Sequence, residues 1–302
     1  KPITFKENTG WFIETIENKS LPSYVEAEYY IFWNRQKHNF ILCETENVLK
    51  YWDHEIVAAI GFQVFNDLDT CLYAHNMHKT GKLLGQGAFG NVWELQTTDG
   101  SKKALKKIPM TQDSMKWLNP NKKRGECLGL MLPEHENILQ IKSLILKKHN
   151  NANYILVNKE NADLPIGKNY SVHAVISEAV EGAQELSDYV HNPKTATLNA
   201  TERGVRIEKM KQIGRKTAQA LQAMHDKNIL HRDIKPPNLL VVENEEGKIE
   251  KVKLIDFGLG RNLGKAPNGR TFSRCGSAMY AAPEVLLANL LRGRAYAKPA
   301  DV

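Results

Sequence analysis

One stretch of the chain decides its fold: His231-Arg232-Asp233-Ile234-Lys235-Pro236-Pro237-Asn238. Asp233 can accept or orient the proton of a substrate hydroxyl. Asn238 lies close enough on the same loop to ligate Mg²⁺. Lys235 can neutralise the charge of a phosphoryl group during its transfer. The loop therefore combines a carboxylate, an amide and an ammonium group at a spacing that suits phosphoryl chemistry.

A glycine-rich stretch lies upstream, Gly85-Gln86-Gly87-Ala88-Phe89-Gly90-Asn91-Val92. Glycine lets the backbone approach phosphate oxygens and offer them its N–H groups. The same G-x-G-x-x-G pattern also opens dinucleotide-binding folds, where it leads into a helix followed by an acidic residue. Here Val92-Trp93-Glu94-Leu95 continues as a strand, and the next landmark is Ala104-Leu105-Lys106. Lys106 is interpreted as the phosphate-pairing lysine, and Lys107, on the other face of that strand, is the alternative.

Two further motifs follow the loop at residues 231–238. Asp256-Phe257-Gly258 comes directly after the apolar run Val252–Ile255, and its carboxylate is a suitable Mg²⁺ ligand. The later stretch Cys275-Gly276-Ser277-Ala278-Met279-Tyr280-Ala281-Ala282-Pro283-Glu284 resembles the peptide-binding and A-P-E segment of protein kinases. Ser277 stands where that family usually has threonine, and its hydroxyl keeps the expected hydrogen bonds to Asp233 and Lys235.

With four motifs in the family's order, residues 80–302 resemble the eukaryotic-type serine/threonine protein kinase catalytic domain. The resemblance implies ATP and Mg²⁺ as cofactors, with Asn238 and Asp256 as metal ligands. It implies that Asp233 and Lys235 are catalytic and that a lysine at position 235 indicates serine/threonine specificity. It also implies that Glu126, in the place of the family's helix-C glutamate, pairs with Lys106.

The resemblance also locates the expected nucleotide site. The glycines of the phosphate loop are Gly85, Gly87 and Gly90, and Ser177-Glu178-Ala179-Val180 resembles the hinge. Backbone groups of Glu178 and Val180 would hold the edge of the adenine. The ring would lie between Val92, Ala104 and Leu240.

Ser177 falls at the gatekeeper position, where the family usually carries a larger residue. We therefore expect a back pocket open to bulky purine-analogue inhibitors. Arg232 is the kind of arginine that in this family often receives a phosphorylated activation-loop residue. Ser273 is the first candidate for that phosphosite and Thr271 the second, while ordinary loop hydroxyls are the alternative.

The order of expected elements predicts a small β-rich lobe followed by a helical lobe, with a crevice between them. The resemblance implies an α+β, two-lobed protein kinase fold, with a β-rich N-lobe and a helical C-lobe. Strands are expected at residues 82–90, 91–96, 103–108, 138–146, 172–177, 239–242 and 252–255. A helix is expected at 202–226, another after Pro120, and a polar loop at 147–171. The predicted domains are an extension at 1–80 and a kinase domain at 81–302, divided into lobes at 81–180 and 181–302.

Composition is that of an ordinary globular protein, with 42% hydrophobic and 25% charged residues over 302 positions. The net charge of +7 favours anionic partners without choosing among them, and no nucleic-acid partner is predicted. Four scattered cysteines without a C-x-x-C pair argue against a zinc site and favour a cytosol-like reducing compartment. A secreted effector acting in a host cytosol stays an alternative. No transmembrane segment or signal peptide is expected, although the chain begins at Lys1 and an upstream segment is conceivable.

The two ends of the chain also carry expectations. Residues 1–80 match no recognised motif and are expected to bind a regulatory protein or to pack on the N-lobe, by analogy alone. Ala300-Asp301-Val302 resembles the start of the helix at the centre of the C-lobe, so the C-lobe is expected to be incomplete and the chain to be part of a longer protein. Expressed alone, such a piece would be expected to aggregate.

Two other functions compete with an active protein kinase that uses ATP. A pseudokinase or scaffold would use the fold for partner binding, but it has no chemical need for Lys106, Asp233, Asn238 and Asp256 together. A small-molecule kinase on the same fold is disfavoured by the A-P-E and peptide-binding segment.

Overall fold

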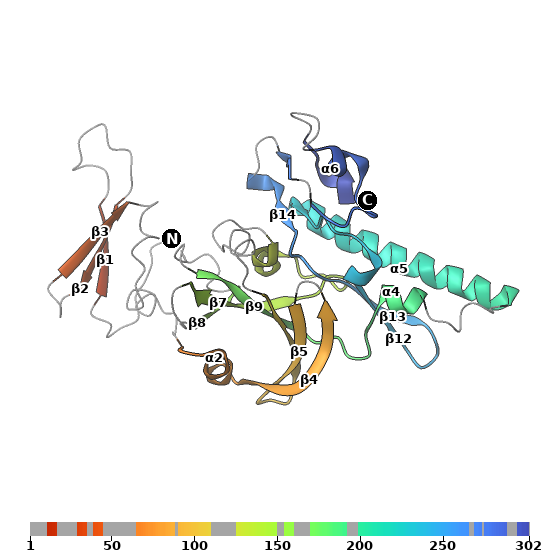
Figure 1. Ribbon diagram of the computed structural model, residues 1–302, viewed down its shortest axis with the longest axis horizontal. Helices are drawn as coiled ribbons and strands as arrows, with labels where there is room; N and C mark the ends of the chain where they lie inside the picture. The colour runs from red at the N-terminus through yellow and green to blue at the C-terminus, as the bar shows by residue number, and fades with distance from the viewer. Residues whose placement is uncertain are drawn as a thin grey trace. The chain divides into compact units, whose positions relative to one another are not determined.

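The computed structural model in Figure 1 places the chain in two compact units. The first unit comprises Lys1–Lys122 and Ser143–Ile176, and the second comprises Lys123–Lys142 and Ser177–Val302. The structure describes residues 11–16, 29–34, 39–44, 65–87, 90–109, 125–149, 154–159, 170–191, 199–265, 269–273, 275–288 and 295–301.

An antiparallel three-stranded sheet lies at the start of the chain and is drawn in red in Figure 1. It contains β1 (Trp11–Ile16), β2 (Tyr29–Asn34) and β3 (Asn39–Glu44), in that order. The central strand is rich in aromatic and β-branched residues, which favour strands. Its register pairs Phe12 with Trp33 and Trp33 with Phe40. The segment before residue 80 therefore contains regular structure of its own.

A six-stranded sheet forms the body of the first unit, in the order β4-β5-β6-β9-β7-β8. Its strands are β4 (Met77–Gly87), β5 (Gly90–Thr97), β6 (Lys102–Lys107), β7 (Ile141–Lys148), β8 (Tyr154–Asn158) and β9 (Tyr170–Glu178). The register pairs Val92 with Lys106 and Glu94 with Ala104. Because directly opposed residues share a face, Val92, Ala104 and Lys106 lie on one side of this sheet.

The opposite face of the sheet packs against helix α2 (Leu68–Ala74). Asp67 caps the helix by accepting a hydrogen bond from the backbone N–H of Thr70 at 2.7 Å. A buried cluster joins the helix to the sheet, and its members are Phe65, Leu68, Cys71, Leu72, Met77, Leu95, Leu105, Ile145, Tyr154, Leu156, Ala174 and Ile176. The hydrophobic core of this unit thus takes residues from Phe65 onward, while the predicted boundary between residues 80 and 81 stays a prediction.

The second unit holds most of the helices. It contains α4 (Leu186–Val190), α5 (Ala200–Asp226) and α6 (Pro283–Leu287), with short 3₁₀ turns η4 (Gly125–Met131), η6 (Pro236–Asn238), η7 (Leu263–Lys265) and η9 (Lys298–Asp301). Its strands are β10 (Gln184–Glu185), β11 (Ile229–Leu230), β12 (Leu239–Glu243), β13 (Ile249–Leu254) and β14 (Arg261–Asn262). They form two small sheets, β10-β12-β13 and β11-β14.

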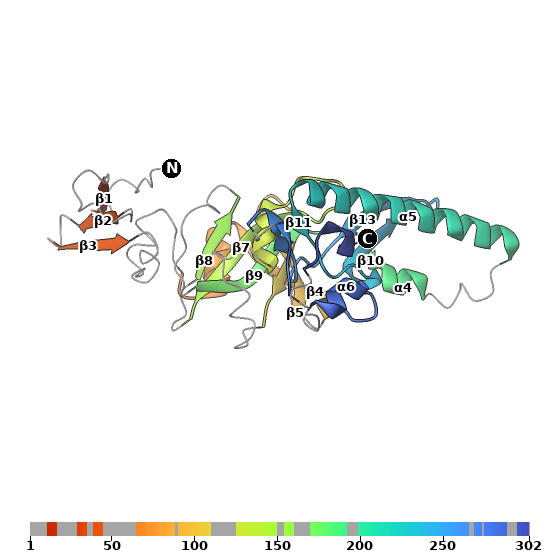
Figure 2. The same cartoon turned by 90° about the horizontal axis from the view of Figure 1, so that it is seen from above.

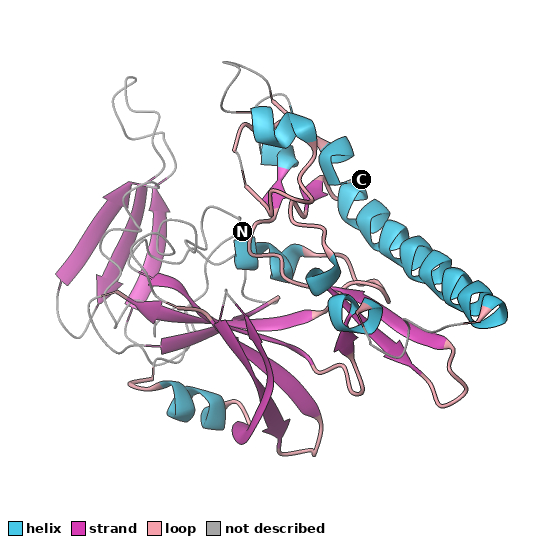
Figure 3. Ribbon diagram, turned by 45° about the vertical axis from the view of Figure 1, so that its right-hand side comes forward, coloured by secondary structure: helices cyan, strands magenta, loops and turns pink. Residues whose placement is uncertain are grey.

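Helix α5 is the long helix seen lengthwise in Figure 2. A capping box fixes its start, because Asn199 and Glu202 each accept the other's backbone N–H at 2.9 and 2.8 Å. The helix packs against β11 and β13 of the same unit, and Figure 2 labels both strands beside it. In Figure 3, α5 is the long cyan helix. The packing fixes β11, which leads into the loop at residues 231–238, and β13, which pairs with the strand β12 that follows the loop.

The expected strands and the helix at 202–226 are confirmed, with bounds that shift by up to about five residues. The expectation of a purely polar loop at 147–171 is wrong, because Tyr154–Asn158 forms β8, whose first four residues are buried. The helix expected after Pro120 appears as the 3₁₀ turn at 125–131, and residues 112–124 lie outside the described part of the chain.

Helix α5 buries apolar side chains only in its later part, at Ile213, Ala220, Leu221 and Met224. Val205 and Ile207 are about half exposed. Among the described residues, no helix has the length and hydropathy that a membrane-crossing helix requires.

Candidate active site

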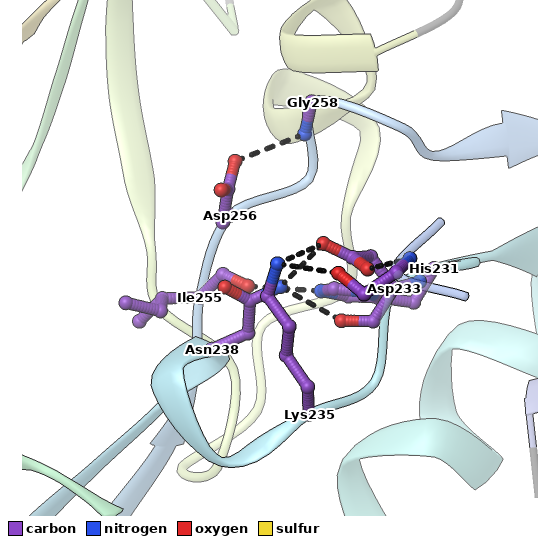
Figure 4. A network of polar contacts seen from close by, with 8 residues as sticks. His231, Asp233, Lys235, Asn238, Ile255, Asp256 and Gly258 are labelled. Carbon is purple, nitrogen blue, oxygen red and sulfur yellow. Dashed lines mark hydrogen bonds and ion pairs between the residues drawn. The ribbon is translucent and has the colours of Figure 1, made fainter. Parts of the chain in front are cut away.

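Asp233, Lys235 and Asn238 come together in one buried network, shown in Figure 4. Lys235 Nζ lies 2.8 Å from Asp233 Oδ2. Asn238 Nδ2 donates to the backbone carbonyl of Asp233 at 2.7 Å and to its Oδ2 at 3.1 Å. The Asp233 carboxylate is therefore held in one orientation by groups on its own loop.

Ser277 adds contacts from a distant part of the sequence. Its backbone N–H donates to Asp233 Oδ1 at 2.8 Å, and Lys235 Nζ donates to its hydroxyl at 2.9 Å. The expected bond between Lys235 and the hydroxyl is present, and the bond to Asp233 comes from the backbone. The segment 275–284 is thereby fixed to the loop that bears Asp233.

The charge state of Asp233 follows from these contacts. Burial raises the pKa of its carboxyl, but the hydrogen bonds from Lys235 and Ser277 outweigh burial and hold the pKa below its ordinary value of 3.8. Asp233 is thus an ionised hydrogen-bond acceptor at neutral pH. Such a group can orient a hydroxyl and receive its proton as that hydroxyl loses it.

Asp301 holds the backbone immediately before Asp233. Its Oδ2 accepts the N–H of His231 at 2.8 Å, its Oδ1 accepts the N–H of Arg232 at 2.7 Å, and His225 Nε2 lies 3.1 Å from Oδ2. Arg232 has a φ of +70°, a conformation that a non-glycine residue keeps only where its surroundings hold it. The sequence interpretation missed this role, although Asp301 stands in the A-D-V string quoted at its end.

Asp256 lies next to this network because a backbone bond joins the two segments. The N–H of Ile255 donates to the carbonyl of Asn238 at 3.0 Å, and His231 Nε2 contacts the carbonyl of Ile255 at 2.9 Å. Phe257 packs edge-on against the His231 ring at 5.4 Å. Asp256 itself has a φ of +61°, with its Oδ1 3.4 Å from the N–H of Gly258. Figure 4 shows Asp256 on the segment next to Asn238, with its carboxylate directed toward Gly258 and away from Asp233.

The residues present fit a magnesium ion bound together with phosphates. The Nδ2 group of Asn238 is bonded to Asp233, so its oxygen, the atom that Mg²⁺ prefers, lies on the other side of the amide. Asp256 supplies a carboxylate nearby. Within the described ranges, no group of three or more His, Cys, Asp or Glu residues could hold a metal alone. Mg²⁺ commonly uses one or two protein oxygens and completes its shell with phosphate and water.

In the first unit, the glycine-rich motif is the end of the β4–β5 hairpin. Its register pairs Gly85 with Val92 and Gly87 with Gly90. Gly90 has a φ of +121°, and the carbonyl of Lys107 occupies the space that a Cβ would need. Because a strand and not a helix follows the motif, the dinucleotide-binding alternative is excluded for this stretch. Lys106 lies on the same face as Val92 and Ala104.

The predicted hinge is anchored through the Glu178 side chain in the second unit. Glu178 Oε1 accepts from Lys253 Nζ at 2.7 Å and from the N–H of Gln140 at 2.8 Å. Buried Ser177 donates its hydroxyl to the Glu178 carbonyl at 3.1 Å. Val180 accepts from the N–H of Ala183 at 3.3 Å. Leu240 lies partly buried in β12, and the adenine-binding roles of Glu178, Val180 and Leu240 stay predictions.

Glu126 is 4% exposed in the 3₁₀ turn η4 of the second unit, and Lys106 lies in the first unit. The predicted ion pair between Lys106 and Glu126 stays a prediction.

Comparison with known proteins identifies the family. Residues 78–302 match the protein kinase domain. The chain belongs to the protein kinase family. Its two-lobed α+β fold, predicted from the four motifs, is confirmed by this match. Kinases of this family generally use ATP and Mg²⁺.

Several serine/threonine kinases are similar to this family member. The serine/threonine-protein kinase ATG1c of Arabidopsis thaliana is 28% identical over 207 residues, covering 68% of this chain and 23% of the relative. DCLK1 of Rattus norvegicus is 30% identical over 210 residues, covering 69% and 39%. CG17528 of Drosophila melanogaster is 29% identical over 213 residues, covering 70% and 23%. The chain thus spans between about a quarter and two fifths of the length of these relatives.

Proposed function

We propose that this protein is a serine/threonine protein kinase, which transfers the γ-phosphoryl group of ATP to a hydroxyl of a protein substrate. The observation that carries the proposal is the network of Asp233, Lys235 and Asn238, with Asp256 beside it. A pseudokinase would not need an ionised carboxylate, an ammonium group and two oxygen ligands arranged together. The names of its relatives agree with this assignment.

Each residue has a role in the proposed reaction. Asp233 orients the substrate hydroxyl and receives its proton as the oxygen–phosphorus bond forms and the bond to ADP breaks. Lys235 offsets the charge on the phosphoryl oxygens while it stays 2.8 Å from Asp233. Mg²⁺, when bound by Asn238 and Asp256, neutralises the phosphates. Lys106, paired with Glu126, would hold the phosphates, and Gly85, Gly87 and Gly90 would cover them.

The experiment that tests this function is phosphotransfer by the full-length protein from labelled ATP to generic protein substrates, followed by phosphoamino acid analysis. Label on serine and threonine is the expected result. Label confined to tyrosine would contradict the specificity assigned to Lys235. Label on small metabolites alone would favour a small-molecule kinase, and no transfer at all would favour a scaffold.

We also propose that Ser273 is the phosphosite in the activation segment. Thr271 is completely buried and its backbone is paired with Tyr296, whereas Ser273 is partly exposed. A kinase acting in trans needs an accessible hydroxyl, so Ser273 is the better acceptor of the two. Mass spectrometry of active protein should find phosphate on Ser273, and full activity with an unmodified segment would contradict the proposal.

The remaining assignments concern partners and location. A regulatory protein bound through residues 1–80 and a cytosol-like compartment both stay part of the proposal. Within residues 1–80, helix α2 packs in the hydrophobic core of the first unit, whereas β1, β2 and β3 form a separate sheet. A binding role is therefore better placed before Phe65 than after it.

A further inference from the structure

Tyr296 contacts two segments of the second unit: the loop at residues 231–238, called the catalytic loop below, and the stretch that contains Thr271, Ser273 and Ser277, called the activation segment. It is 3% exposed and packs in a cluster with Leu230, Leu263, Val285 and Ala288. Its backbone forms an antiparallel bridge to Thr271, in which each N–H donates to the other's carbonyl, at 2.9 and 3.0 Å. The ring and the backbone of Tyr296 are therefore fixed independently of its hydroxyl.

The hydroxyl of Tyr296 connects two segments. It accepts a hydrogen bond from Arg232 Nη1 at 3.3 Å and donates one to the backbone carbonyl of Ser273. Cys275 Sγ lies 3.7 Å away. Burial raises the pKa of Tyr296 to about 12, so the hydroxyl keeps its proton and stays a donor throughout the physiological range.

Arg232 carries this connection to the catalytic loop. Its side chain is buried, Nε donates to the carbonyl of Leu259 at 2.7 Å, and Asp301 fixes its backbone N–H. A buried guanidinium needs acceptors for its N–H groups, and the Tyr296 hydroxyl is one of them. Because Arg232 directly precedes Asp233, a displacement of the arginine is passed to the catalytic aspartate.

The same stretch of the activation segment reaches Asp233 at a second point. Ser277 is bonded to Asp233 and Lys235, as described above. Gly276, next to it, has a φ of +93°, and a Cβ there would lie 2.5 Å from the carbonyl of Arg232. Residues 271–277 are thus held at one end by Tyr296 and at the other by the catalytic loop.

We propose that Tyr296 is a positioning residue, whose hydroxyl holds residues 271–277 against the catalytic loop so that Ser277 stays bonded to Asp233 and Lys235. The proposal rests on the function proposed above, because the aligned group is the catalytic carboxylate. It assigns to a buried tyrosine the task of keeping the segment in place without a phosphate.

The test is Tyr296→Phe in the full-length protein after phosphatase treatment, so that phosphate on the segment does not contribute. Phenylalanine keeps the ring in its cluster and removes only the hydroxyl. We expect kcat to fall about fivefold to tenfold, because the hydroxyl loses its bonds to the Arg232 guanidinium and the Ser273 carbonyl, with KM for ATP within about twofold. Tyr189→Phe is the matched control, because that half-buried hydroxyl bonds Glu243 and not the activation segment. Its kcat should not change.

Two further measurements separate positioning from simple destabilisation. The amide of Ser277 should exchange with solvent faster in Tyr296→Phe, while the melting temperature shifts no more than in Tyr189→Phe. Combined with Ser277→Ala, Tyr296→Phe should lower kcat by less than the product of the two single effects, since both changes weaken the contact between Ser277 and Lys235. Unchanged kcat, multiplicative effects in the double variant, or unchanged exchange at Ser277 would each overturn the proposal.

The exchange measurement also distinguishes this proposal from the proposed function. If the wild type transfers no phosphoryl group, the function fails, yet faster exchange at Ser277 in Tyr296→Phe would still support the positioning role. If Tyr296→Phe does not fold, amide exchange in the wild type tests the proposal. The Ser277 amide should then be protected from exchange with solvent as strongly as the Thr271 amide. A freely exchanging Ser277 amide beside a protected Thr271 amide would contradict the proposal.

Discussion

The backbone N–H of Ser277 donates to Asp233 Oδ1 at 2.8 Å, although 44 positions separate the two residues in the sequence. Lys235 closes the triangle, since its ammonium group contacts both side chains. The position of Ser277 and the charge of the Asp233 carboxylate therefore depend on the same few hydrogen bonds.

Removing the Ser277 hydroxyl should weaken catalysis while the fold survives. In Ser277→Ala, Lys235 loses the acceptor at 2.9 Å, and we expect kcat to fall by at least about tenfold, because a hydrogen bond from a charged donor contributes about 1.5–3 kcal/mol. Ser277→Thr keeps the hydroxyl and should keep most of the activity. Steady-state kinetics of both variants test this, and equal activity of Ser277→Ala and Ser277→Thr would contradict it.

The Asp233 carboxyl should titrate below the ordinary range. Its folded pKa is lowered, so the carboxylate persists as the pH falls through 3.8, and the stability it contributes is lost only below that point. Carbon NMR of labelled aspartate, assigned by the signal missing in Asp233→Asn, should show an ionised Asp233 down to about pH 4. A midpoint above pH 4 would show that burial outweighs the hydrogen bonds.

A larger residue at position 177 should block bulky purine-analogue inhibitors. Ser177 is 7% exposed, and its small side chain bonds the carbonyl of Glu178. Wild-type protein should be inhibited at least about tenfold more strongly than Ser177→Phe, provided that the variant keeps a cooperative melt. Dose–response curves for both proteins test this prediction. Equal inhibition would contradict the assignment of Ser177 to the back pocket.

Breaking the ion pair of Lys253 with Glu178 should destabilise the protein. Both side chains are largely buried. In Lys253→Met, Glu178 loses the ammonium group and keeps the hydrogen bond from the Gln140 N–H. We expect a loss of about 1–3 kcal/mol in the free energy of unfolding, measured by urea denaturation. Lys251→Met is the matched control, because its pair with Glu250 is half exposed and should contribute less than about 1 kcal/mol. Equal losses in the free energy of unfolding for the two variants would show that the buried pair contributes no more stability than the exposed pair.

The sequence predicted which residues of the candidate site lie together, because they are concentrated in short strings. Asp233, Lys235 and Asn238 lie within eight positions, so one loop conformation brings them together. The strands after the glycine motif were also predictable, since the turn signal Asp99-Gly100 separates two short runs that contain apolar residues.

Other features depended on contacts between distant positions. Asp301 binds the backbone of His231 and Arg232 about 70 positions away, and nothing in its local sequence marks a hydrogen-bond acceptor for that loop. Tyr296 likewise lies in an unremarkable run, and its importance comes from three partners on two distant segments, Arg232 on one and Ser273 and Cys275 on the other. Strand β8 was missed because Tyr154–Asn158 is a short apolar run inside polar sequence, where a local pattern is weak.

The central claim is that Asp233 makes this protein a phosphotransferase, and one comparison tests it most directly. The full-length wild type, Asp233→Asn and the control Asp226→Asn, an exposed aspartate at the end of α5, are compared for transfer of labelled phosphate to protein serine and threonine. The account predicts transfer by the wild type and Asp226→Asn, and a loss of at least about a hundredfold in Asp233→Asn. Equal rates for the wild type and Asp233→Asn would contradict it.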